Sequence, residues 1–224
     1  MFRNSNDYCE PLDLLNAVEK ENEQVSSEIF FNNPKYQKAQ EKWCAAVFGV
    51  GFNEYCKKCR IRINESKHHT SPDFFLKIDD QVFEFEMTER QEPDRKRGKY
   101  YKEIKQNSLM LTPNRPERGR QEGPSWIYQA IKKKVEKCYS NCRNLNILVY
   151  ANFDAHTMDR KAILQKSREF ADKFASIWII TNQHICSLFS NNALGEIDDF
   201  KEIKELRNRF FSALGLYPAQ TNRQ

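Results

Sequence analysis

Three carboxylates in the middle of the chain have a spacing that could bind a metal ion. Glu84 and Glu86 stand two positions apart in the run 82–88, where apolar and polar residues alternate as they do along a β-strand. Their side chains would therefore point to the same face of the strand, about 7 Å apart. Asp73 opens the preceding strand-like run, and a two-residue turn at 79–80 would place it directly opposite Glu86.

The chemistry that these side chains suggest is hydrolysis of a phosphodiester with the help of Mg²⁺ or Mn²⁺. Converging carboxylates offer hard oxygen donors, which suit these ions better than Zn²⁺. A divalent ion in such a site can lower the pKa of a bound water and neutralise charge on a phosphate. The same local sequence also fits a half-exposed strand with glutamates on its wet face, but the position of Asp73 favours the metal site.

Basic residues are concentrated just after these carboxylates, between residues 90 and 137. The net charge of the chain is only +5, so it is this local concentration that indicates an acidic partner. Tyrosines interleave with the charges, as they do in segments that bind phosphates and bases together. A solvated loop and helix face is the alternative. The predicted nucleic-acid-binding residues are Arg95, Lys96, Arg97, Lys99, Tyr100 and Lys102.

The composition describes a compact folded chain, with 39% hydrophobic and 30% charged residues among 224. No apolar run reaches the roughly 20 residues that cross a bilayer, and the first residues lack the apolar stretch of a secretory signal. The seven cysteines are an odd number and fall in helical or strand patterns, as free thiols do. These features predict a cytoplasmic protein in a reducing compartment, with no membrane partner.

The hydrophobic periodicity predicts an α/β fold. Helical spacing covers the runs 11–27, 35–58, 126–139, 161–174 and 197–214, with a further helical portion near 99–109. Strand-like patterns cover 59–64, 73–78, 82–88, 145–150, 177–181 and 185–189. Because apolar strands alternate with helices, we expect a three-layer α/β/α arrangement with a central mixed sheet.

The chain is expected to divide into a core and two terminal parts. Residues 1–33 would form an N-terminal helical extension, 34–192 the α/β core, and 193–224 a C-terminal helix and tail. Within the core, the Gly/Pro/Arg-rich stretch 90–123 is expected to be a long functional excursion, and the next helix is expected to start after Pro124. The terminal helices could serve a homodimer.

The order of these elements around the carboxylates resembles the PD-(D/E)xK nuclease superfamily. The matching residues are Pro72-Asp73, a ten-residue spacer, and Glu84-Phe85-Glu86. The resemblance covers most of the chain and implies a restriction-endonuclease-like fold in which Asp73 and Glu84 bind the metal. Glu86 stands where the family usually has lysine, and this Glu-x-Glu form is similar to some restriction endonucleases. The alternatives are that the site has lost its activity or that the lysine has moved.

The resemblance adds three further candidates. Lys99 has an offset from Glu84 that is similar to the arrangement in viral cap-snatching endonucleases. Lys133 lies on the helix that supports the active site in relatives. Glu54 falls on the apolar face of the helix 35–58, and relatives carry a metal-binding glutamate on their first helix. Surface charge, or a frayed helix end for Glu54, is the alternative for each.

These features together favour a metal-dependent endonuclease, with DNA rather than RNA as the expected substrate, in defence or restriction. The expected metal ligands are Asp73, Glu84, Glu86 and Glu54, and the expected catalytic residues are Asp73, Glu84, Glu86, Lys99 and Lys133. A second hypothesis is a catalytically inactive nuclease-fold module that binds nucleic acid or a protein partner. A third is a zinc-stabilised adaptor built on the cysteine pairs 56/59 and 138/142.

Overall fold

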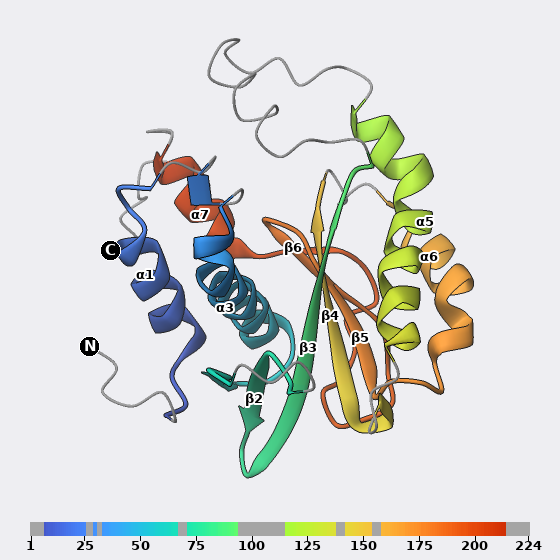
Figure 1. Ribbon diagram of the computed structural model, residues 1–224, viewed down its shortest axis with the longest axis horizontal. Helices are drawn as coiled ribbons and strands as arrows, with labels where there is room; N and C mark the ends of the chain where they lie inside the picture. The colour runs from blue at the N-terminus through green and yellow to red at the C-terminus, as the bar shows by residue number, and fades with distance from the viewer. Residues whose placement is uncertain are drawn as a thin grey trace, which may run out of the picture.

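The computed structural model describes residues 7–25, 29–30, 33–66, 71–93, 115–137, 142–153 and 158–213. Its centre is a seven-stranded sheet in which the strands lie in chain order (Figure 1). The strands are β1 (Arg60–Ile63), β2 (Phe74–Ile78), β3 (Gln81–Gln91), β4 (Leu145–Asn152), β5 (Ser176–Ile180), β6 (His184–Ser190) and β7 (Lys201–Glu202). The sheet is mixed, because β3, β4 and β5 run parallel and all other neighbours are antiparallel.

The β2–β3 hairpin confirms the expected pairing. Residues 79–80 form the two-residue turn, and its first residue has a φ of 51°, the positive value that such hairpin turns require. The ladder runs from this turn to the pair Phe74 and Phe85. The next position beyond that pair is Asp73, which therefore lies across from Glu86.

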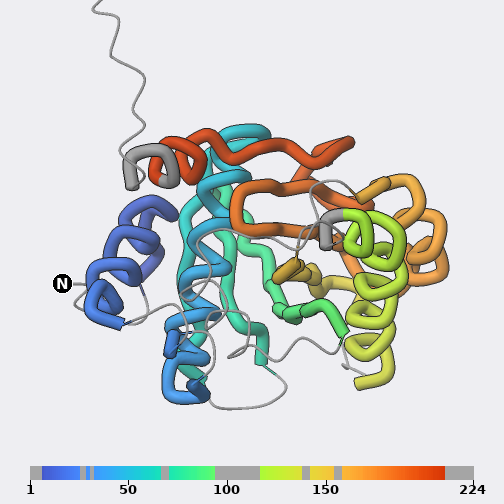
Figure 2. Tube along the Cα trace, turned by 90° about the horizontal axis from the view of Figure 1, so that it is seen from above, coloured from blue at the N-terminus to red at the C-terminus, as the bar shows by residue number. Residues whose placement is uncertain are grey.

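Helices lie on both sides of the sheet (Figures 1 and 2). On one side are α1 (Pro11–Glu21), α3 (Gln37–Tyr55) and α7 (Lys204–Ala213), and on the other are α5 (Arg115–Glu136) and α6 (Arg160–Ser167). Short 3-10 helices cover η1 (Pro34–Tyr36), η2 (Cys142–Asn144) and η3 (Arg168–Phe170). The fold is therefore a mixed α/β fold.

The hydrophobic core on the α3 side holds the acidic strands in place. Phe48 of α3 is fully buried, and its ring centroid lies 5.0 Å from that of Phe85 and 5.4 Å from that of Trp178. Phe74 stacks on Phe85 at 4.8 Å. Because these rings come from α3, β2, β3 and β5, they fix the helix against the strands that carry the candidate site.

The same core also includes both described terminal parts. Leu15 of α1 is fully buried in it, as are Leu194 and Ile203 near the C-terminal end. A second core lies under α5 and α6, and its buried members in the described residues come from α5, α6 and β4–β6 with their connections, with none from β1, β2 or β3. The far face of β1 and β2 is therefore not covered by that core.

The start of α5 differs from the expectation. The helix was expected after Pro124 but begins at Arg115, with Pro124 inside it. The turns of α5 that precede Pro124 carry ion pairs at helical spacing, with Arg118 Nε 3.0 Å from Glu122 Oε1. Such pairs stabilise an exposed helix, so the Gly/Pro/Arg content that indicated a loop was misleading here.

The other differences concern the ends of helices. α1 ends at Glu21, and α6 ends at Ser167 before a 3-10 turn. The expected helix 197–214 is wrong at its start, because Lys201–Glu202 form β7 and the helix begins only at Lys204. β7 pairs with the edge of β6, a tertiary contact that local periodicity does not report.

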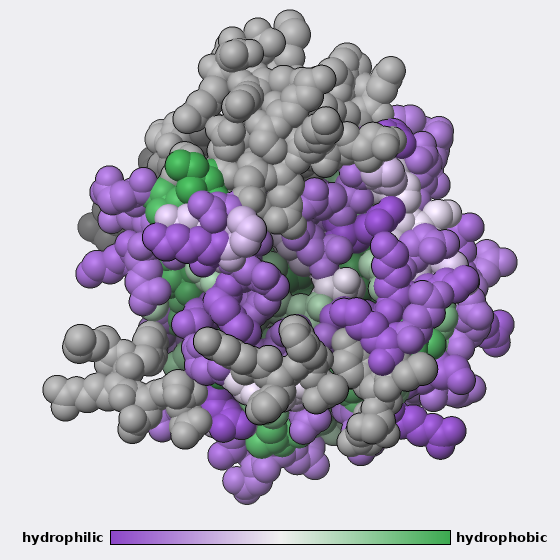
Figure 3. Space-filling model, viewed as in Figure 1, coloured by the Kyte–Doolittle hydropathy of each residue, from purple (hydrophilic) through white to green (hydrophobic). Residues whose placement is uncertain are grey.

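The described surface is mainly polar. Figure 3 shows a largely hydrophilic face with small, separate hydrophobic areas. The large hydrophobic side chains exposed in the described part of the chain are Leu12, Ile29 and Val82. No described helix is both long and apolar enough to cross a membrane.

Candidate active site at the start of β2

Asp73 lies just before β2, level with Glu86 in the middle of β3. Its Oδ2 accepts a hydrogen bond from the backbone N–H of Met87 at 2.7 Å, and its own N–H donates to the Phe85 carbonyl at 2.8 Å. The carboxylate thus accepts the Met87 N–H in place of a backbone carbonyl of a neighbouring strand. Because the group lies close to the plane of the sheet, charges from both faces act on it.

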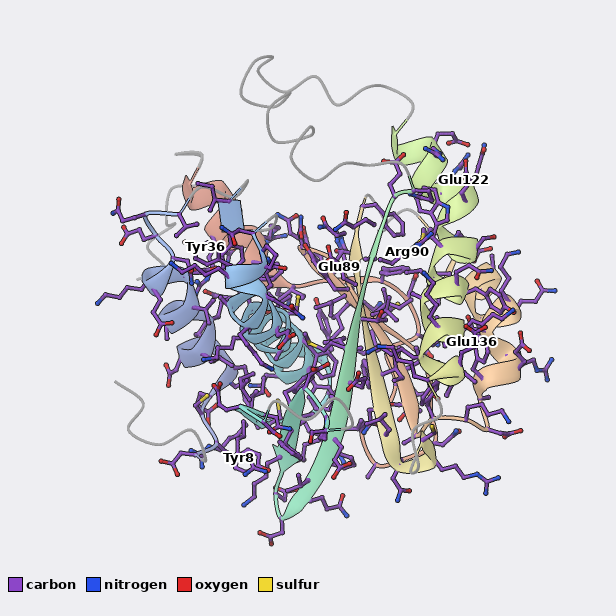
Figure 4. All side chains as sticks on the ribbon, in the orientation of Figure 1. Tyr8, Tyr36, Glu89, Arg90, Glu122 and Glu136 are labelled. Carbon is purple, nitrogen blue, oxygen red and sulfur yellow. The ribbon has the colours of Figure 1, made fainter. Side chains whose placement is uncertain are left out.

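A hollow of about 160 Å³ opens beside Asp73 on the α3 side of the sheet. Two further carboxylates line it, Glu41 from α3 and Glu89 from β3. Figure 4 labels Glu89 on the α3 side of β3 and Arg90 on the α5 side, as alternation along a strand requires. Three acidic residues from three separate segments of the chain therefore line one hollow. The other lining residues are Gln37, Gln40, Cys44, Met87, Thr88, Leu148 and Tyr150.

Hydrogen bonds orient these two glutamates to different degrees. Glu89 Oε1 accepts from Asn152 Nδ2 at 2.8 Å and from Gln91 Nε2 at 2.9 Å. Glu41 Oε1 accepts from Gln37 Nε2 at 3.2 Å. Its Oε2 lies 2.7 Å from the Nζ of Lys38, whose side chain is 45% exposed. Because an exposed lysine side chain gains little by holding one geometry, Glu41 can exchange this partner for another cation more readily than Glu89 can leave Asn152.

The electrostatic environment of Asp73 is unfavourable for a negative charge. Burial, followed by the negative charge of Glu86, raises the pKa of Asp73 to about 6. The Met87 N–H and the Lys134 ammonium act in the opposite direction, and Glu41 adds to the rise. Carboxylates with such shifts in a hollow are often functional, since a cation bound there would relieve the repulsion.

This shift predicts how Asp73 affects stability with pH. A folded-state pKa of about 6 against an ordinary 3.8 means that the native protein binds this proton more tightly than the unfolded chain does. The contribution of Asp73 to stability is therefore full below about pH 4 and is lost as the pH rises through about 6. We expect Asp73→Asn to be more stable than the wild type at pH 7.5, with the difference shrinking toward pH 4.5.

Urea unfolding at these two pH values measures the effect. Asp172→Asn, which changes an exposed aspartate elsewhere, is the matched control and should show no such trend. A stability difference between Asp73→Asn and the wild type that is the same at both pH values would contradict the assigned environment.

Glu86 and Lys134 form a buried ion pair on the α5 side of β3. Lys134 Nζ lies 2.5 Å from Glu86 Oε1, and each residue is only 7% exposed. The ion pair engages the Glu86 carboxylate, which was expected to bind a metal directly. It also places a lysine ammonium next to Asp73, close enough to act on its pKa.

The structure separates Glu84 from this site. Glu84 pairs with Phe75 nearer the hairpin turn, and its side chain is exposed. It lines a different, open hollow of about 820 Å³ together with residues such as Arg143 and Asp172. The expected cluster of Asp73, Glu84 and Glu86 is thus brought together only in part, as the opposed pair Asp73 and Glu86.

Glu54 is also placed away from Asp73. It lies near the C-terminal end of α3, where its two carboxylate oxygens accept hydrogen bonds from the backbone N–H groups of Lys204 and Glu205 at 3.0 and 3.1 Å. These are unpaired donors of the first turn of α7, so Glu54 caps that helix. The acidic residue that α3 brings to the hollow is Glu41, near the other end of the helix.

We therefore expect Glu54→Ala to destabilise the protein by about 1 kcal/mol, as the loss of a helix cap does, without changing any activity of the hollow. Thermal unfolding and the nuclease assay described below are the measurements. Glu54→Gln, which keeps one acceptor oxygen, should lose less. If a folded Glu54→Ala protein loses activity, Glu54 takes part in the function of the site and is more than a helix cap.

Lys133 lies on the exposed side of α5, and the neighbouring Lys134 is the lysine that reaches the candidate site. The structure thus brings Lys134 to the candidate site in place of Lys133, because successive helical residues differ by about 100° in direction. The other predicted residues lie outside the described residues: Arg95, Lys96, Arg97, Lys99, Tyr100 and Lys102.

Sequence reasoning missed Glu41, Glu89 and Lys134. For Glu89 the signal is its position two residues after Met87 on the apolar side of β3, but the predicted strand ends at Thr88. Glu41 had a signal of the same kind, since Gln37, Gln40 and Glu41 share one helical face. Only the contact between α5 and β3 distinguishes Lys134 from its neighbours.

Any metal site in the described residues would have to be open rather than enclosed. No group of three or more His, Cys, Asp or Glu side chains among them is arranged to hold a metal ion. Mg²⁺, however, is commonly bound by one or two carboxylates and completed by waters and substrate phosphates. Asp73, half-buried beside like charges, and Glu41, whose ion-pair partner is an exposed lysine, offer that smaller donor set.

No family model matches the chain, and no curated protein or solved structure does either.

Proposed function

We propose that this protein is a divalent-metal-dependent phosphodiesterase that cleaves nucleic acid at the hollow lined by Glu41, Asp73 and Glu89. The observation that carries the proposal is Asp73 itself. It is a half-buried carboxylate with a raised pKa, held across from Glu86 at the start of β2. A group that costs stability above pH 6 is more readily explained by a role in binding a cation than by a role in folding.

The roles of the residues follow from their surroundings. Asp73 and Glu41 would hold Mg²⁺ or Mn²⁺, and the ion would supply charge neutralisation at the scissile phosphate. Glu89, fixed by Asn152, faces the same hollow and would orient an attacking water through its carboxylate. Lys134 positions Glu86 and keeps one positive charge near Asp73. It would thereby stand in for the lysine that the sequence lacks at position 86.

The resemblance to the PD-(D/E)xK superfamily supports this proposal in part. The element order and the Asp73–Glu86 pairing agree with a restriction-endonuclease-like, three-layer arrangement, which we propose as the finer description of the fold. DNA, cleaved internally, stays the proposed substrate in preference to RNA. The six described cysteines are all free, which supports the proposed reducing, intracellular environment.

The test is cleavage of plasmid, single-stranded DNA and RNA in the presence of Mg²⁺, Mn²⁺ or EDTA. We expect products that require the metal and are lost in Asp73→Asn. If the wild type and Asp73→Asn leave the same products on every substrate, the enzymatic proposal fails.

A second candidate is a catalytically inactive module of the same fold. The observation that favours it is the closed Glu86–Lys134 pair, which leaves Glu86 little freedom to bind a metal. This candidate predicts nucleic-acid or protein binding that neither Mg²⁺ nor Asp73→Asn alters.

A further inference from the structure

The outer face of β1 and β2 carries cations and aromatic rings in alternation. The face opposite the α3-side core presents Arg60 and Arg62 on β1, and Phe75 and Lys77 on β2. Arg60 lies across from Lys77, and Arg62 lies across from Phe75. Because the second core includes none of the described residues of these two strands, no apolar layer formed by the described part of the chain covers this face.

Tyr8, labelled in Figure 4 beside the lower end of β2, extends this face. The neighbouring Cys9 pairs with Ile61 at the free edge of β1, with two backbone hydrogen bonds of 2.8 Å. The Arg62 guanidinium carbon lies 4.3 Å from the ring centroid of Phe75 and 5.2 Å from that of Tyr8. Lys77 Nζ lies 5.9 Å from the Tyr8 centroid. The result is a stack of planar groups bordered by positive charge.

The charges of this face are weakly neutralised. Arg60 has an acidic neighbour, Glu10, at 3.8 Å, and both side chains are more than half exposed, so that contact is weak. Arg62 and Lys77 form no ion pair within the described residues, and the buried Nε of Arg62 has no hydrogen-bond partner there. Glu84, across from Phe75 on β3, is the acidic side chain that adjoins the stack.

We propose that this face, formed by Tyr8, Arg60, Arg62, Phe75 and Lys77, binds single-stranded nucleic acid. Half-exposed rings and a guanidinium plane offer stacking surfaces to unpaired bases, and the cations match the phosphate charge. A duplex hides its base faces and therefore cannot use the rings. Binding does not depend on hydrolysis, but the consequence for substrate delivery rests on the proposed function. Phe75 is two residues from Asp73, about 7 Å along β2, but the hollow opens on the other, α3 side of the sheet, so a bound strand would have to pass around the start of β2 to reach it.

The test is fluorescence anisotropy in EDTA with labelled oligothymidylate of about 12 nucleotides and a duplex of equal length, over a range of salt concentrations. We expect tighter binding of the single strand. Lys77→Gln should reduce the salt slope by about 0.7, the value for one phosphate contact to a single strand. Lys166→Gln, which removes the same charge from an exposed position on α6, should leave the slope unchanged.

The aromatic contribution is tested separately. Phe75→Leu should weaken binding about 5- to 150-fold without changing the salt slope, as loss of one stacked base does. Tyr8→Leu, outside the sheet, is the second variant if Phe75→Leu does not fold. Equal affinity for the duplex, or an unchanged salt slope in Lys77→Gln, would overturn the proposal.

Asp73→Asn separates this inference from the proposed function. It should bind the oligonucleotide as the wild type does in EDTA. If binding follows Lys77 and Phe75 while no substrate is cleaved, the phosphodiesterase proposal fails and the binding surface stands.

Discussion

Replacing Lys134 by alanine should lower the free energy of unfolding by about 3–5 kcal/mol, the expected cost of leaving one member of a buried ion pair alone. Lys134 and Glu86 are each 7% exposed and their charged atoms are 2.5 Å apart. Without the ammonium, the Glu86 carboxylate would lie at the interface of β3 and α5 with much of its charge uncompensated. Chemical denaturation at constant pH measures the loss.

Lys133→Ala is the matched control. It removes the same side chain from the next position of the same helix, but from its exposed side. Its effect should stay within about 0.5 kcal/mol. If both variants lower the free energy of unfolding by a similar amount, α5 must be rotated differently about its axis.

A double variant separates charge from packing. Glu86→Leu combined with Lys134→Met replaces the pair by apolar side chains of similar size, and such replacements are often neutral or stabilising. We expect its stability to be close to that of the wild type. If the double variant is as unstable as Lys134→Ala, the pair contributes specific packing and not only mutual neutralisation. The same variant should fold but cleave poorly, because it lacks Lys134, the lysine proposed to stand in for the one missing at position 86.

The second large effect concerns Asp73 and catalysis. Asp73→Asn should reduce metal-dependent cleavage by about 10²- to 10³-fold, as the loss of one group that stabilises the transition state does. It should also remove Mn²⁺ binding as measured by calorimetry. The physical reason is that asparagine can still accept the Met87 hydrogen bond but offers no charge to a cation.

Proton release gives this prediction a second readout. Because the pKa of Asp73 is raised to about 6, Mn²⁺ binding at pH 6 should release about half a proton, and binding at pH 8 almost none. Buffers of different ionisation enthalpy measure that number. Glu84→Gln is the matched control, because Glu84 lies on the same strand but lines the other hollow. Metal binding that depends on Glu84 and is indifferent to Asp73 would support the ligand set expected from the sequence instead.

The sequence by itself determined the strands and the hairpin that carry the acidic residues. Alternation in the run 82–88 and the turn at 79–80 were enough to place Asp73 across from Glu86, because the turn length fixes the register of a hairpin. The apolar run of β4 likewise predicted a strand buried along its whole length. These are local signals, and they were confirmed.

Only the tertiary structure decided which charged residues meet. Glu84 and Glu86 have the same strand pattern, yet one is exposed and the other is buried against α5. Lys133 and Lys134 are chemically identical neighbours, and the rotation of α5 over β3 selects the second. Glu41 reaches the hollow because the aromatic core sets where α3 lies on the sheet. Helix rotation and position depend on packing between distant parts of the chain, and the spacing of residues along one segment does not encode them.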